Sequence, residues 1–230
     1  MPDVDAAGGA DVGGGADVGG GGRVRRGTGS LVGSRGTALS LQDQAALTGA
    51  YSWVEHRLFE LLGSWVASEP LDEARLLFDL HSHEHAWHAQ LFAERLPVLD
   101  GVDRKALATA PNSDLERFMQ LVELADSTLL RLVGVGRVVL PRLICGYSLH
   151  VRRADSVADA PLVRALRLAL GDEVESWQAT EALVERLLRT ADDVSAATGH
   201  ASALEKELAG GGAGQGLVHW PARALGDSRA

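Results

Sequence analysis

Residues 40–68, SLQDQAALTGAYSWVEHRLFELLGSWVAS, indicate the fold class because apolar side chains recur along them every three or four positions. That spacing places them on one face of an α-helix. Ser40 can cap the helix with Asp43 three residues later, and Pro70 stops it. The stripe on this face consists of Tyr51, Glu55, Leu58, Leu62 and Trp65.

The same helical period continues through the rest of the chain as far as about residue 208. Leu and Ala dominate the composition, which favours helix over strand, and no long stretch alternates with a period of two. Gly134 and Gly136 are expected to interrupt the pattern and separate two helices. We predict an all-α four-helix bundle with additional helices, its later helices covering about 72–96, 114–133, 137–154, 160–189 and 193–208, with a short turn near Asp103.

The two ends of the chain differ in composition from the periodic part. GADVGG at 9–14 is repeated unchanged at 15–20, and so much glycine cannot offset the entropy lost on ordering. We therefore predict a disordered tail over 1–39, a helical domain over 40–208 and a flexible tail over 209–230. Within the last segment, Leu217, Val218 and Trp220 are able to dock on the bundle.

Charge and hydropathy exclude several classes of partner. The net charge is −9, which argues against nucleic-acid binding. No stretch approaches the roughly 18 consecutive apolar residues of a membrane span. Cys145 is the only cysteine, which rules out an intramolecular disulfide and suits a reducing compartment, so we expect a cytoplasmic protein.

Carboxylates within the apolar stripes are the strongest indication of a site. A buried carboxylate costs several kcal/mol unless it is paired, protonated or bound to metal. In the second helix, His81 and His88 flank such a carboxylate, Glu84. The stripe predicted there is Leu77, Leu80, Glu84, Trp87 and Leu91, and the stripe of the long late helix is Leu166, Leu170, Glu173, Trp177 and Val184.

The three glutamates are expected to lie at the same height along the bundle. Glu55 precedes the turn at Glu69–Pro70 by as many residues as Glu84 follows it, so an antiparallel hairpin brings the two to the same height. Glu173 reaches this height if the late hairpin enters from the opposite end of the bundle. The three carboxylates are therefore expected to meet near mid-bundle.

This layout over roughly 41–190 resembles the ferritin-like superfamily. The resemblance implies two iron or manganese ions, held by a Glu from each of two helices and a Glu-x-x-His pair from each of the other two. Three residues after Glu84 stands Trp87, and three after Glu173 stands Ser176, so the sequence departs from both pairs. The remaining candidate ligands for one or two divalent metals are Glu55, Glu84, His88 and Glu173, with His81 in reserve. Redox or oxygenase-type chemistry on a small molecule is implied by analogy.

A metal-free protein is the alternative from a different functional class. Glu55 or Glu173 would then be neutralised by Arg137 or Arg142, and the histidines of HSHEHAWH (81–88) would form a polar face or a metal-free pocket. Such a bundle would bind a partner or assemble with itself as a homo-oligomer.

Overall fold

The computed structural model of the chain describes residues 39–98, 100–101, 103–210, 217–218 and 220. The predicted disorder of the N-terminal tail falls on residues outside these ranges, apart from Leu39, which is buried. The described part is all-α, as predicted, and contains no strand. Its helices are α1 (Leu41–Val66), α2 (Asp72–Arg95), α3 (Arg104–Leu107), α4 (Ser113–Glu123), α5 (Thr128–Val133), the π-helical η1 (Gly134–Val139), α6 (Leu140–Arg153), α7 (Ala160–Leu187) and α8 (Ala191–Gly210).

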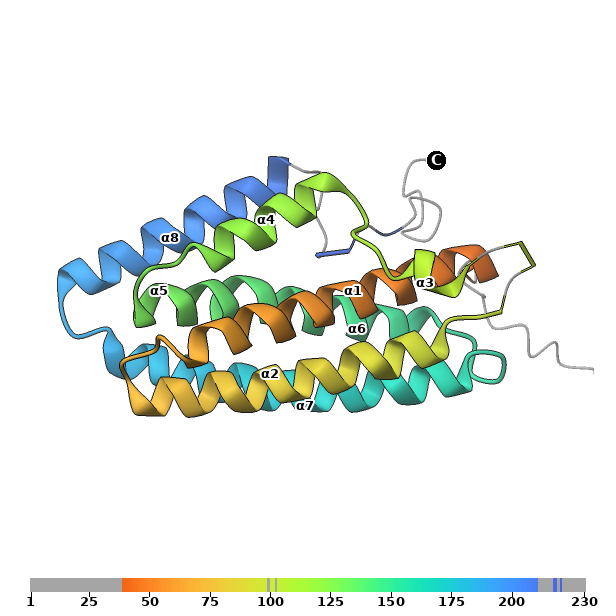
Figure 1. Cartoon of the computed structure of the whole chain (residues 1–230), viewed down its shortest axis with the longest axis horizontal. Helices are drawn as coiled ribbons and strands as arrows, with labels where there is room; N and C mark the ends of the chain where they lie inside the picture. Colours follow the sequence, from red (N-terminus) through yellow and green to blue (C-terminus); the bar gives the residue numbers. More distant parts are fainter. Residues whose placement is uncertain (1–38, 99, 102, 211–216, 219, 221–230) are drawn as a thin grey trace, which may run out of the picture. The chain divides into compact units, whose positions relative to one another are not determined.

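Helix α1 begins and packs as its sequence predicts. The Ser40 hydroxyl accepts a hydrogen bond from the Asp43 amide at 3.1 Å, and the Asp43 carboxylate accepts from the Ser40 amide, so both halves of a capping box are present. The whole predicted stripe, Glu55 included, is buried. Helix α2 then returns antiparallel along α1 (Figure 1).

The middle of the chain differs from the prediction in two places. The helix expected over 114–133 is broken after Glu123, and α5 restarts where the Ser127 side chain accepts a hydrogen bond from the Leu130 amide. The expected break at Gly134 and Gly136 is absent from the described structure, because η1 joins α5 to α6.

The π-helical segment accommodates Pro141, which lacks an amide hydrogen and whose ring would crowd a regular α-helical turn. The Leu140 amide donates to the Val135 carbonyl five residues back, which is the π pattern. Gly136 lies close against α7, since a Cβ added there would stand 2.5 Å from Thr180 Cγ2. Close packing of two helices thus explains Gly136, and the predicted helix break at this position is wrong.

Four helical rods form the bundle: α1, α2, the continuous α5–η1–α6, and α7 (Figure 1). Helix α2 and the α5–α6 rod run in the same direction, so the chain needs a long crossover between them, and α3 and α4 lie within it. Helix α8 lies beside α4 and packs against α5 and η1 (Figure 1). None of the helices in the described ranges has the length and apolar character that a bilayer span requires.

Candidate metal centre

Helix α2 turns a different face to the core from the one predicted. Leu80 and Trp87, both assigned to the inner stripe, are 54% and 44% exposed. The side chains that α2 buries are instead mostly polar or aromatic: Ala74, Phe78, His81, Ser82, His85, His88, Ala89 and Phe92. The predicted stripe of α2 is therefore wrong. His85 and His88 are buried because they face carboxylates from α1 and α7, and this turns Leu80 and Trp87 outward.

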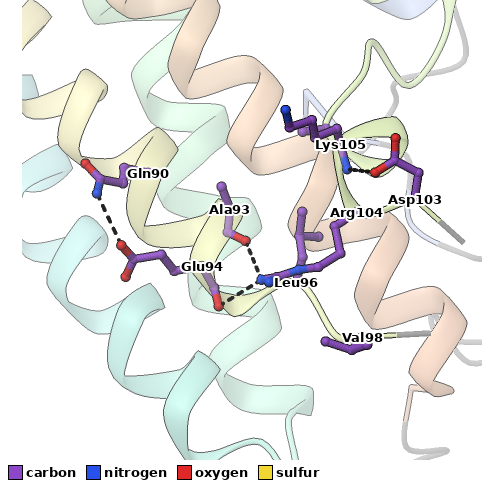
Figure 2. Close-up of a pocket in the computed structure, with 9 residues that line it drawn as sticks. Gln90, Ala93, Glu94, Leu96, Val98, Asp103, Arg104 and Lys105 are labelled. Atoms are coloured by element: carbon purple, nitrogen blue, oxygen red, sulfur yellow. Dashed lines mark hydrogen bonds between the residues drawn. The ribbon is translucent and has the colours of Figure 1, made fainter. Parts of the chain in front are cut away.

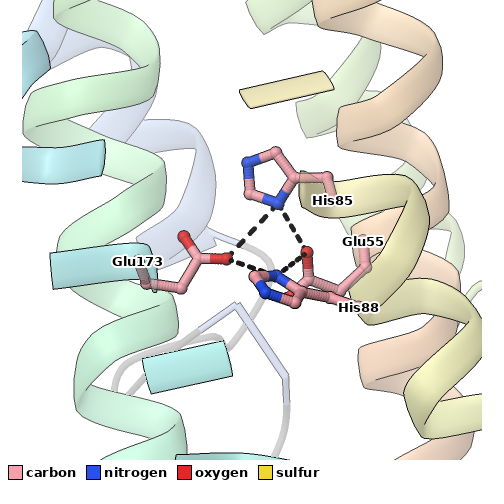
Figure 3. Close-up of side chains that lie close together, drawn as sticks. All are labelled: Glu55, His85, His88 and Glu173. Carbon is pink, nitrogen blue, oxygen red and sulfur yellow. Dashed lines mark hydrogen bonds and ion pairs between the residues drawn. The ribbon is translucent and has the colours of Figure 1, made fainter. Parts of the chain in front are cut away.

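Four buried side chains from three helices converge at this level of the bundle (Figure 3). They are Glu55 of α1, His85 and His88 of α2, and Glu173 of α7, and one ligand atom from each lies within 4.8 Å of all the others. His85 Nδ1 is 2.5 Å from Glu55 Oε2 and 3.3 Å from Glu173 Oε1. His88 Nδ1 is 3.6 Å and 3.3 Å from the same two oxygens. We call these four residues the Glu–His cluster.

The spacing within the Glu–His cluster is compatible with one metal ion. Ligand atoms about 2.1 Å from a common ion are about 3.0 to 4.2 Å apart, depending on coordination geometry. The four nitrogen-to-oxygen distances of 2.5 to 3.6 Å need only small side-chain adjustments to reach such separations. Two imidazoles and two carboxylates are a donor set that iron, manganese and zinc accept.

Several buried atoms of the cluster have no hydrogen-bond partner among the described residues. Both carboxylate oxygens of Glu173 are in this state, as are His88 Nδ1 and His85 Nε2. Glu173 is only 1% exposed, so water does not compensate its charge. The two imidazoles, each 3.3 Å from Glu173 Oε1, offset the charge of this carboxylate without forming well-aligned hydrogen bonds to it. A metal ion between these atoms would supply the direct partner that they lack.

The charges within the cluster favour the ionised forms of Glu55, His85 and His88 when no metal is bound. Burial alone would lower the histidine pKa values, but Glu173 and Glu55 raise the pKa of His85 to about 10 and that of His88 to about 11. Burial would raise the pKa of Glu55, but His85 and His88 hold it at about 2. Two carboxylates thus face two imidazolium ions, and their charges cancel.

The tyrosine nearest to the cluster comes from α6. The Tyr147 hydroxyl donates to Glu55 Oε1, the carboxylate oxygen that does not face His85. Tyr147 is fully buried. Burial and the neighbouring carboxylates raise the pKa of Tyr147 well above its ordinary value, so it stays protonated and fixes the orientation of Glu55.

The structure brings together three of the five ligands predicted from the sequence, Glu55, His88 and Glu173. Glu84 lies outside the cluster, where it is half-buried and accepts a hydrogen bond from Ser176 Oγ at 2.9 Å. Burial raises the pKa of Glu84. His81 is buried one turn before His85 and is also outside the cluster, and its pKa falls to about 3, chiefly because of burial.

His85 is the member of the cluster that sequence reasoning missed. The sequence does contain an indication of its role. His85 and His88 are three residues apart and so share a helix face. The Glu-x-x-His pattern of the ferritin-like resemblance does not single out His85, because Ser82 stands three residues before it. In this chain a histidine occupies the place of the glutamate in that pattern.

The arginines proposed to neutralise the buried glutamates pair with other residues. Arg137 makes a two-pronged ion pair with Glu181, at 2.6 and 3.0 Å, and Arg142 pairs with Glu205. The basic groups found beside Glu55 and Glu173 are the two histidines. The buried network around these glutamates is therefore of Glu and His rather than Glu and Arg.

A surface groove of about 840 Å³ near the end of α2 is a weaker candidate for a site (Figure 2). Its polar groups already stabilise the local chain. The Arg104 guanidinium donates to the carbonyls of Ala93 and Glu94, and the Asp103 carboxylate caps α3 by accepting from the Lys105 amide. Among the described residues that line it, the groove lacks the convergent, unpartnered groups that mark the Glu–His cluster.

Comparisons with protein-family models, with curated proteins and with solved structures give no match.

Proposed function

We propose that this protein is a ferritin-like metalloprotein that holds one divalent iron or manganese ion in the Glu–His cluster and uses it for redox chemistry on a small molecule. The observation that carries the proposal is the convergence of two carboxylates and two imidazoles, all buried, within 4.8 Å. Glu173 adds weight, since neither of its oxygens has a hydrogen-bond partner among the described residues.

The charge balance also supports a divalent ion. In the metal-free cluster, two imidazolium charges offset two carboxylates. A divalent ion that displaces one proton from each imidazole leaves the net charge of this buried region unchanged. Binding therefore does not add an uncompensated charge to the core, which would be expensive.

The topology supports the ferritin-like assignment. The bundle has one long crossover, and its ligands project inward from facing helices, which is the arrangement described for di-iron and di-manganese carboxylate proteins. The four-residue cluster provides ligands for a single ion, so we propose one metal rather than two.

Redox chemistry is the most suitable use of this donor set. Two histidines and one carboxylate are the ligands of many non-haem iron oxygenases, and a bound iron ion would supply reaction with oxygen. The chain's own part is to exclude water from the cluster, orient Glu55 through Tyr147 and orient His88 through Asp172, whose carboxylate accepts from Nε2.

The decisive experiment is elemental analysis of the purified protein, before and after reconstitution with Fe(II), Mn(II) and Zn(II). We expect near-stoichiometric iron or manganese in the natural sequence and its loss in Glu173→Gln, because that change removes one ligand charge without changing side-chain volume. Glu84→Gln is the matched control and should retain metal. Circular dichroism would verify that both variants remain helical.

Two results would contradict the proposal. Failure of all three metals to bind would reject the metal centre. Retention of zinc alone would reject the redox assignment.

A further inference from the structure

A row of buried aromatic side chains leads from the Glu–His cluster to the C-terminal segment. Tyr147, bonded to Glu55, has its ring centroid 4.9 Å from that of Tyr51 in an edge-to-face contact. The Tyr51 ring is 5.7 Å from that of His150, which is 5.3 Å from that of Trp220. These separations are those of aromatic groups in direct contact. None of the four side chains is more than 2% exposed.

Tyr51 and His150 form a hydrogen-bonded pair within this row. The Tyr51 hydroxyl oxygen lies 3.2 Å from His150 Nδ1, while His150 Nε2 has no hydrogen-bond partner among the described residues. If Nδ1 carried the imidazole proton, both the phenol hydrogen and the bare Nε2 would be unpaired. With the proton on Nε2, the Tyr51 hydroxyl donates to Nδ1 and only one group is left unpaired.

His150 is a neutral base in this pair. Burial lowers its pKa to about 4, although Asp159 acts in the opposite direction. The imidazole is thus uncharged at neutral pH and has a lone pair directed at the phenol. Burial also keeps the pKa of Tyr51 far above its ordinary value, so the phenol retains its proton while it is in the reduced state.

We propose that Tyr51 is a one-electron donor to the metal centre, with His150 as the acceptor of its proton. One electron leaves the Tyr51 ring and one proton moves from its hydroxyl oxygen to His150 Nδ1, giving a neutral tyrosyl radical and an imidazolium ion. An oxidised iron or manganese ion held by the Glu–His cluster would be the one-electron oxidant that accepts this electron. Only this identification of the oxidant rests on the proposed function.

Tyr147 lies between the donor and the cluster and acts as the bridge. Its hydroxyl donates to Glu55, so loss of its proton would protonate a metal ligand and weaken the site. Tyr51 has a separate acceptor in His150, outside the cluster. The radical therefore resides on Tyr51, and the Tyr147 ring conducts the electron through its contacts with Tyr51 and Glu55.

The test uses metal-free protein and an external oxidant, so that it is independent of metal binding. Photogenerated tris(bipyridine)ruthenium(III) would oxidise the protein in a flash-quench experiment, with transient absorption and electron paramagnetic resonance as readouts. The chain contains only two tyrosines, which makes the assignment of a tyrosyl signal direct. Because Cys145 is exposed and oxidisable, all samples would carry Cys145→Ser.

We expect a tyrosyl radical in this background and in Tyr147→Phe, and loss of the signal in Tyr51→Phe. His150→Leu, which keeps Tyr51 but removes the proton acceptor, should also lose it. Circular dichroism would verify that the variants are folded. A tyrosyl signal of unchanged yield in Tyr51→Phe or in His150→Leu would overturn the proposal. Absence of metal binding with these photochemical results intact would reject the metal centre but leave the redox pair.

Discussion

Asp172 Oδ2 lies 3.0 Å from Nε2 of His88, on the side of the imidazole ring opposite to the Glu–His cluster. When a metal displaces the proton of Nδ1, this hydrogen bond would keep the remaining imidazole proton on Nε2. Carboxylates that hold a histidine ligand in this way orient the ring and raise its basicity. Asp172 is thus a positioning residue for the proposed ligand that it contacts.

Asp172→Ala is expected to weaken metal binding by about 10- to 100-fold, the usual effect of losing such a partner. The ring of His88 would then be free to take the other tautomer or to rotate. Competition titration against a coloured chelator measures the change. Glu175→Ala removes an exposed carboxylate from the same helix and should leave the affinity nearly unchanged. Equal affinity in both variants would mean that Asp172 does not position His88.

Metal binding is expected to release two protons per ion over the neutral pH range. The pKa values of His85 and His88, about 10 and 11, mean that both are protonated before the metal enters. The apparent affinity should therefore rise by about two log units per pH unit. Isothermal titration calorimetry in buffers with different ionisation enthalpies counts the protons. Release of none would show that the histidines are neutral in the metal-free protein.

The metal-free protein is expected to lose stability as the pH rises above neutrality. Unfolded histidines titrate near pH 6.5, whereas His85 and His88 have pKa values of about 10 and 11 in the fold. The folded state thus binds more protons between these limits. Its stabilisation by the two imidazolium ions is complete below about pH 6.5 and is lost as the pH approaches 10 to 11.

Thermal unfolding of chelator-treated protein at several alkaline pH values measures this loss. His88→Gln should make the decline shallower, because one of the two titrating groups is gone. His56→Gln, which changes an exposed histidine of α1, is the control and should leave the slope unchanged. A melting temperature that does not depend on pH in this range would contradict the charge state assigned to the cluster.

The helices were predictable from sequence where local signals decide them, and the site was predictable only in part. The capping box at Ser40 and the stripe of α1 depend on residues close together in the chain, and both are confirmed. The face that α2 buries depends on the carboxylates that α1 and α7 direct toward it. These carboxylates are distant in sequence from the histidines that they face, so the local pattern of α2 does not reveal this effect. The spacing of the apolar residues therefore predicted that Glu84 and Trp87 face the core. In the structure, His85 and His88 face it instead.

The continuity of the α5–α6 rod was unpredictable for a related reason. Glycine lowers helix propensity, so a pair of glycines normally favours a break. At Gly136 the small residue permits close packing against Thr180 of another helix, which the local sequence does not reveal. The apolar side chains that η1 buries against α7 and α8 stabilise the continuous rod by more than the low helix propensity of the two glycines costs.

Gly136→Ala tests whether this close packing holds η1 against α7. The new Cβ would lie 2.5 Å from Thr180 Cγ2 and 3.2 Å from its Cβ, so the helices must separate or the threonine must move. Overpacking of this kind costs about 1–3 kcal/mol, which chemical denaturation would measure. Gly171→Ala, at an exposed site of α7 with open space, should instead stabilise by about 0.5–1 kcal/mol.

A second variant separates the steric contact from the backbone effect. Thr180→Ser removes Cγ2, the atom nearest to the added methyl group. Combined with Gly136→Ala, it should recover part of the lost stability, so the two changes would be coupled rather than additive. Additive effects, or a Gly136→Ala protein as stable as the natural one, would mean that glycine is not required for the approach of these helices.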